Sequence, residues 1–171
     1  EGAAYWIIRT APIKLGDFLW SKFWTGLIPV FVLTESLTMA GNELMGIDPF
    51  LKVVTAVAIA FMSLALVGLA AGLGARYPRF GADNATQVAG SFGGVTFMLV
   101  AVFYVLVSIV LLGWPSSVYL ISRVRDIPLS AAQQLLMGGC FLTGIVLSLA
   151  TWWLSMRSGV RALEQMDSTP G

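Results

Sequence analysis

Three polar side chains interrupt the first long apolar run of this chain, namely Glu35, Asn42 and Glu43. A carboxylate at the centre of a membrane helix costs roughly 2.5–3.5 kcal/mol, and by default such a residue contacts a proton, a substrate or a buried partner. At a helical rise of about 1.5 Å per residue, Glu35 lies about 27 Å from Asp17, in the outer half of the run. Two interpretations stay open. Either Glu35 has a functional role, in contact with a proton or a substrate, or it is structural, paired with another residue or placed at the membrane interface, where we also expect Asn42 and Glu43.

Motifs of common catalytic and nucleotide-binding sites do not occur in the sequence. The 171 residues contain no histidine and one cysteine, and they contain no G-x-x-x-x-G-K-[ST], H-E-x-x-H or G-x-S-x-G motif. Histidine is the commonest general base and metal ligand, and the first of these motifs is the P-loop that cradles ATP phosphates. We therefore expect no enzyme activity, metal or cofactor in this chain. The net charge of +1 argues against a nucleic-acid partner.

The composition places these residues in a lipid bilayer. Hydrophobic residues make up 57% of the chain and charged residues 11%, whereas soluble domains contain about 25% charged residues. A membrane helix needs about 20 mainly apolar residues, and helices satisfy their own backbone in lipid. We predict an all-α fold, an integral membrane helical bundle in which Pro115 closes the third helix. The four transmembrane helices are expected at residues 17–45, 53–75, 94–114 and 133–156.

The distribution of Lys and Arg predicts the orientation. Seven of the ten lie ahead of or at the start of the first run, in the loop 76–93 and in the tail 157–171. Because cytoplasmic loops carry an excess of positive charge, we expect both ends and the loop 76–93 in the cytoplasm. The segment 43–52 and the loop 115–132 then face outward. Aromatic side chains that suit the two membrane interfaces are Trp20, Trp24, Trp114 and Tyr119.

Small residues recur at a spacing of four, which places them on one helix face. Small side chains let membrane helices approach closely. The pattern predicts either a dedicated helix or subunit interface or the ordinary packing of a glycine-rich bundle. The residues concerned are Ala56, Ala60, Gly68, Gly72, Gly90 and Gly94.

Two loop segments carry a family resemblance. The chain opens with E-G-x-x-x-W-x-x-R-x-A-P-I, followed after four residues by F-L-W-S-K-F. The loop after the second run contains R-Y-P-R-F, then Asn84-x-x-Gln87 and S-x-G-G. These segments resemble the cytoplasmic loops of ABC-2-type transporter permeases, in particular a bacterial subgroup of ABC exporter permeases. The resemblance extends over nearly the whole chain but is specific only in the two loops.

This resemblance implies a function. The chain would contain the last four of six membrane spans of a permease in the bacterial inner membrane, exporting an unidentified substrate. Residues 1–16 would be a coupling segment, and the loop 76–93 would contain a short helix. Both would dock on a separate ATPase subunit that binds ATP, and a second permease copy would complete a homo- or heterodimer. The implied docking residues are Glu1, Gly2, Tyr5, Trp6, Arg9, Pro12, Arg76, Pro78, Arg79, Phe80, Asn84 and Gln87.

Other interpretations of the same features remain. Both cytoplasmic segments are also compatible with amphipathic helices that rest on lipid headgroups. The whole chain is also compatible with a non-transporting assembly subunit that uses its glycine faces. A third hypothesis is a fragment of a secondary transporter in which Glu35 couples transport to protons.

Overall fold

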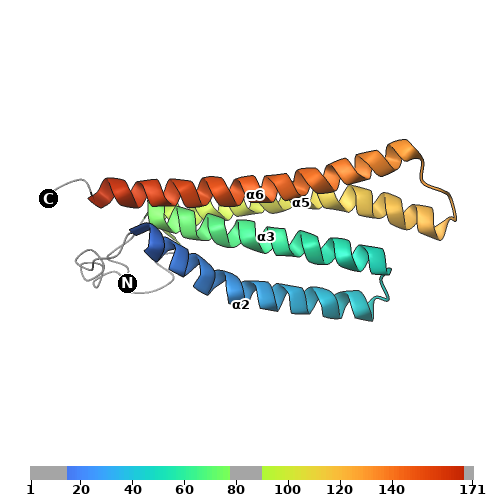
Figure 1. The fold of residues 1–171 in the computed structure, drawn as a ribbon, viewed down its shortest axis with the longest axis horizontal. Helices are drawn as coiled ribbons and strands as arrows, with labels where there is room; N and C mark the ends of the chain where they lie inside the picture. Colours follow the sequence, from blue (N-terminus) through green and yellow to red (C-terminus); the bar gives the residue numbers. More distant parts are fainter. Residues whose placement is uncertain (1–14, 78–89, 168–171) are drawn as a thin grey trace.

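The computed structural model describes residues 15–77 and 90–167, which form a bundle of antiparallel helices (Figure 1). No strand occurs in these two stretches, and the predicted all-α membrane bundle is confirmed. The helices are α2 (Leu15–Leu44), α3 (Pro49–Arg76), α5 (Phe92–Val124) and α6 (Ala131–Asp167).

All four helices are long and apolar enough to cross a membrane. They contain 30, 28, 33 and 37 residues, so at about 1.5 Å per residue even the shortest exceeds a hydrocarbon core about 30 Å thick. The chain is therefore an integral membrane protein. We call the end with the α2–α3 and α5–α6 connections the loop end, and the opposite end, where α2 begins and α6 stops, the terminal end (Figure 1).

Local caps explain where two of the helices begin. The carboxylate of Asp48 accepts a hydrogen bond from the backbone N–H of Phe50 at 3.2 Å, and Pro49 occupies the first helical position of α3. The hydroxyl of Ser91 accepts from the N–H of Gly94 at 3.2 Å at the start of α5. Both caps satisfy N–H groups that have no partner within the helix.

The prediction that Pro115 ends the third helix is wrong. Pro115 is buried inside α5, which continues to Val124, so the expected external loop 115–132 contains nearly three further turns of helix. Proline has no N–H to bond to the carbonyl of Leu111, and membrane helices tolerate such a local loss where neighbouring groups cover the backbone.

The expected tail 157–171 is also mostly helical, because α6 continues to Asp167. Arg157 does not end the helix, and its guanidinium lies 4.8 Å from the ring centre of Trp153. Leu163 is 5% exposed and belongs to the hydrophobic core. The packing of Leu163 therefore accounts for the continuation of α6 past Arg157 and Arg161.

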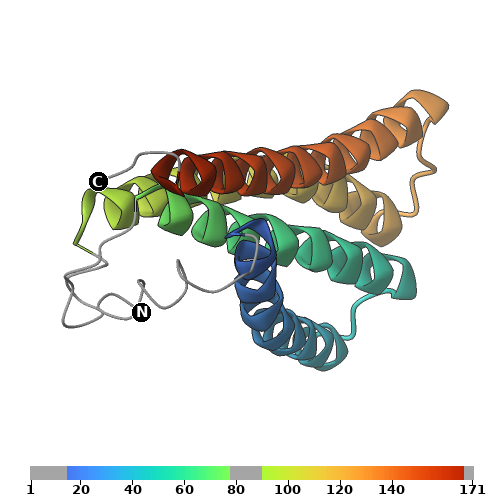
Figure 2. The same cartoon turned by 60° about the vertical axis from the view of Figure 1, so that its left-hand side comes forward.

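The most tightly packed part of the bundle lies toward the terminal end. Leu19, Phe23 and Leu27 of α2 pack with Met156 and Leu163 of α6 in one buried cluster. Toward the loop end the pair α2 and α3 diverges from the pair α5 and α6 (Figures 1 and 2). The bundle thus combines a compact terminal end with a more open loop end.

The glycines of α3 allow the close approach of α6. A Cβ added at Gly68 would lie 2.6 Å from Cδ1 of Trp152, and one added at Gly72 would collide with the backbone carbonyl of Ser155. Across the contact, a Cβ at Gly159 would lie 3.0 Å from the Cα of Gly72. The two backbones meet here without intervening side chains, as small residues permit in membranes.

The other small residues occupy different environments. Ala56 and Ala60 are half-buried along α3, Gly90 lies in the exposed turn before α5, and Gly94 lies in the first turn of α5. Of the predicted small residues, the close contact between α3 and α6 therefore involves Gly68 and Gly72, which lie toward the terminal end of α3.

Candidate functional site

Polar side chains pair between α2 and α3 within the membrane-spanning region. The hydroxyls of Thr34 and Ser63 lie 3.0 Å apart. About two turns nearer the loop end of α2, the amide nitrogen of Asn42 donates to the hydroxyl of Thr55 at 2.8 Å. Asn42 is 7% exposed, so it is a buried contact between helices. Together these pairs form a polar stripe between two otherwise apolar helices.

Glu35 lies next to this stripe and is half-buried. Its Oε1 atom is buried without a hydrogen-bond partner among residues 15–77 and 90–167. A buried polar atom without a partner is uncommon in native proteins and calls for an explanation. No hydrogen bond or ion pair to the Glu35 carboxylate occurs within residues 15–77 and 90–167, so this part of the chain does not contain a structural pairing partner for it.

Exchanging the Glu35 carboxylate for an amide tests its role. If Glu35 exchanges a proton during transport, Glu35→Gln should flatten the pH dependence of basal ATP hydrolysis in a complex with the ATPase subunit that the family resemblance implies, because glutamine does not titrate. Glu43→Gln is the matched control, since Glu43 is exposed and ion-paired with Lys52 at 2.6 Å. An unchanged pH profile in Glu35→Gln would leave Glu35 with a structural role alone.

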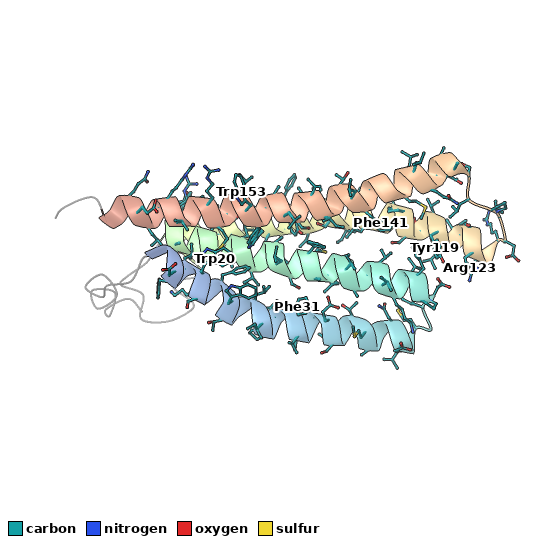
Figure 3. The ribbon with its side chains drawn as sticks, viewed as in Figure 1. Trp20, Phe31, Tyr119, Arg123, Phe141 and Trp153 are labelled. Carbon is teal, nitrogen blue, oxygen red and sulfur yellow. The ribbon has the colours of Figure 1, made fainter. Side chains whose placement is uncertain are left out.

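A cavity of about 340 Å³ lies beside the polar stripe, and we call it the polar cavity. Its walls come from α2, α3 and α5, and its hydrogen-bonding groups belong to Thr38, Asn42, Thr55 and Ser116. A second cavity of about 260 Å³ lies between α3, α5 and α6, and we call it the apolar cavity. Its lining includes the aromatic rings of Phe50, Phe61 and Phe141, and Figure 3 labels Phe141 on α6. Both volumes lie near the lower end of the range of small-molecule sites, about 300–1,000 Å³.

A cluster that we call the clamp joins the α2–α3 connection to the end of α5, and consists of Asp48, Phe50, Tyr119 and Arg123. The Tyr119 hydroxyl donates to Oδ2 of Asp48 at 2.8 Å, and Arg123 lies 3.4 Å from Oδ1. The rings of Phe50 and Tyr119 have centroids 5.0 Å apart. Tyr119 and Arg123 are labelled near the loop end of α5 in Figure 3. Phe50 also lines the apolar cavity, so one side chain belongs both to the clamp and to the cavity wall.

The hydrogen bond from Tyr119 is the main reason why the pKa of Asp48 lies below its usual value, with smaller contributions from Phe50 N–H and Arg123. A lowered folded-state pKa gives stability that is present above the unfolded pKa, near 4, and lost as pH falls through the folded value. We expect Tyr119→Phe to weaken the clamp at neutral pH and to reduce the loss of stability on acidification. Thermal unfolding of the detergent-solubilised protein at neutral and acidic pH measures both effects.

Ser117→Ala is a control for this change, because Ser117 is exposed on the same helix and bonds only to the carbonyl of Trp114. If Tyr119→Phe and the parent protein lose the same stability between the two pH values, the hydrogen bond does not govern the pKa of Asp48.

Most of the residues implied in ATPase docking lie outside the described residues, among 1–14 and 78–89. They are Glu1, Gly2, Tyr5, Trp6, Arg9, Pro12, Pro78, Arg79, Phe80, Asn84 and Gln87. Arg76 is described: it is exposed at the end of α3, and its guanidinium lies 5.7 Å from the ring centre of Tyr77. The structure therefore places one docking candidate at the terminal end.

The residues beside Arg76 connect α3 to α5. The rings of Tyr77 and Phe92 have centroids 5.3 Å apart in an edge-to-face arrangement. A Cβ added at Gly93 would lie 2.7 Å from the Cβ of Tyr77. Because of these contacts, a displacement of the end of α3 would also displace the first turn of α5.

Sequence reasoning missed the clamp and the hydroxyl groups of the polar cavity. Asp48-Pro49 is a typical helix start, but neither its contact with Tyr119 nor that with Arg123, both more than 70 residues away, can be read from spacing. Thr38, Thr55 and Ser116 stood in apolar runs where single hydroxyls are common.

A protein-family model described as "Putative ATP-binding cassette" matches residues 1–168. This chain belongs to that ATP-binding cassette family. No curated protein and no solved structure matches the chain. The family description confirms the ABC part of the resemblance, but it names an ATP-binding component and not a permease.

Proposed function

We propose that the chain is the membrane-spanning permease subunit of an ABC-2-type transporter that exports a substrate still to be identified. The observation that carries this proposal is the extent of the family match: residues 1–168 include all four helices that are long and apolar enough to cross a membrane. The sequence of this region has no P-loop motif, so ATP binding and hydrolysis are assigned to a separate ATPase subunit. The chain itself then catalyses no reaction.

The packing supports a coupling role. The buried cluster at the terminal end and the glycine contact between α3 and α6 join three helices into one compact unit. A push on such a unit moves it as a rigid body. The cavities and the clamp lie toward the more open loop end, so the displacement would change the spaces between the helices there.

The proposed orientation has both ends in the cytoplasm of a bacterium. Basic residues of the described segments at the terminal end are Lys22, Arg76, Arg157 and Arg161, and those at the loop end are Lys52, Arg123 and Arg125. A second permease copy, identical or related, completes the transporter in the inner membrane. Substituted-cysteine labelling from each side of the membrane, in a background with Cys140 replaced, measures this orientation.

The test of the proposed function is copurification. This protein is expressed together with the Walker-type ABC ATPase whose gene lies nearest to its own, which we call the neighbouring ATPase, and the complex is captured from solubilised membranes. We expect the two subunits to elute together at a fixed ratio. An unrelated ABC ATPase is the matched control. Failure of the neighbouring ATPase to bind above that control contradicts the proposal.

A further inference from the structure

We propose that the polar and apolar cavities together bind one uncharged amphipathic lipid, with a hydroxyl head group and a single hydrocarbon chain. This binding does not depend on the proposed coupling to an ATPase. It rests on the position of the cavities, on the chemistry of their walls and on the partners of their polar groups.

The two cavities adjoin each other. Four side chains line both of them, which are Val54, Ala58, Met62 and Leu112. The shared wall is thus formed by one face of α3 and a residue of α5. A ligand with its head group in the polar cavity and its chain in the apolar cavity would lie across these shared side chains, and its two ends would meet different surroundings.

The polar cavity offers hydrogen-bonding groups for a small head group. The amide nitrogen of Asn42 is used by Thr55, but its carbonyl oxygen receives no hydrogen bond from any described residue. The Ser116 hydroxyl donates to Leu112 and keeps its oxygen as an acceptor. The Thr38 hydroxyl also lines the space, and it can both donate and accept. A hydroxyl on the ligand suits this set, because it can donate to Asn42 and accept from Thr38.

The walls select against a charged head group. None of the residues lining either cavity carries a charge. At the loop end Glu43 pairs with Lys52 and Asp48 with Arg123, and the carboxylate of Glu35, which has no described partner, is not part of either cavity lining. Burying an unpaired charge is far more costly than burying a hydroxyl that finds a hydrogen bond. An uncharged head is therefore favoured over a phosphate or an ammonium group.

The apolar cavity suits a hydrocarbon chain, because its few polar groups are already satisfied. The hydroxyl of Ser108 donates to the carbonyl of Tyr104 at 2.9 Å, and that of Ser148 donates to Gly144 at 2.8 Å. Ser148 also bonds to the hydroxyl of Tyr104 at 2.7 Å. The remaining wall consists of aliphatic and aromatic side chains. Hydrocarbon transferred here gains dispersion contacts without leaving a polar group unpaired.

Photolabelling of the purified protein in phosphatidylcholine nanodiscs tests the proposal. The probe is hexadecanol with a diazirine in its chain, and the comparison probe has the same chain with a trimethylammonium head. We expect the alcohol to label peptides of α3 and α5 that line the cavities, and unlabelled hexadecanol to compete. Labelling by both probes to the same extent, spread over lipid-facing helix surfaces and without competition, would mean ordinary lipid contact only and overturn the proposal.

Two substitutions localise the binding. Ala58→Trp fills the shared wall and should reduce the competable labelling about tenfold, whereas Ala70→Trp, on the exposed face of the same helix, should leave it unchanged. If Ala58→Trp does not fold, Thr38→Val keeps the shape of the side chain and removes its hydroxyl. It should weaken binding of the alcohol about three- to tenfold, the effect of one hydrogen bond. The control is Thr143→Val on the exposed face of α6. Equal labelling in Thr38→Val and Thr143→Val contradicts the assigned head-group site.

Discussion

Gly72→Ala is expected to destabilise the protein strongly, although alanine is the better helix former. The added methyl group would collide with the backbone carbonyl of Ser155, and backbone cannot rotate away as a side chain can. Overpacking costs about 1–3 kcal/mol, and the Gly→Ala gain in helix propensity is about 1 kcal/mol. Because a clash with backbone lies at the upper end of the overpacking range, we expect a net loss of about 2 kcal/mol in the free energy of unfolding, measured by SDS titration of the protein in mixed micelles.

The matched control for this change is Gly74→Ala, two residues along the same helix. No atom lies within 4 Å of a Cβ added at Gly74, so only the propensity gain applies and stability should be unchanged or slightly higher. The stability of Gly68→Ala should lie between those of the other two variants, because the added methyl group meets the side chain of Trp152, which can move more easily than backbone. Equal stability of Gly72→Ala and Gly74→Ala would show that α3 and α6 do not meet closely at Gly72.

The double change Trp6→Ala with Arg9→Glu should weaken binding of this chain to the proposed ATPase subunit. Trp and Arg are enriched among the residues that dominate interface energies, where a single truncation costs about 2 kcal/mol or more. A loss of that size weakens binding about thirtyfold. The dissociation constant of the purified complex, measured by titrating labelled ATPase into nanodiscs that contain the chain, gives the result.

A control pair of the same residue types is available on α6. Trp153 and Arg157 are exposed and stack on each other with a separation of 4.8 Å. Trp153→Ala with Arg157→Glu removes the same groups outside the proposed docking segment, and the ATPase affinity should stay close to that of the parent. If this control weakens binding as much as the Trp6 and Arg9 change, the opening segment is not the docking element.

The fold could be predicted from composition and run length, since apolar runs of about 20 residues satisfy their backbone in lipid by forming helices. Their ends could be predicted less well, because the usual rules on helix ends compete with packing. Pro115 lies inside α5 with its side chain fully buried, and Leu163 in the last turns of α6 joins the core. In both cases a contact outweighs a local signal.

The candidate site could be predicted only in part for a similar reason. Glu35 and Asn42 stand out as polar residues in an apolar run, whereas Thr38 and Ser116 gain significance only when three helices place them around one cavity. Gly72 follows from its spacing, and Gly159, which faces it, ends a series of small residues at the same spacing in α6, with Thr151 and Ser155. The clamp depends on contacts between residues far apart in the chain, which no local pattern encodes.

The central claim is that this membrane subunit works with a separate ATPase, and the most direct measurement is the ATP hydrolysis rate of that ATPase. The rate is compared between the neighbouring ATPase alone, the ATPase with this protein in nanodiscs, and the ATPase with the Trp6→Ala, Arg9→Glu variant. We predict a rate that rises several-fold with the parent protein and stays at the basal level with the variant. The same basal rate in all three samples, with a folded membrane protein present, would contradict the account.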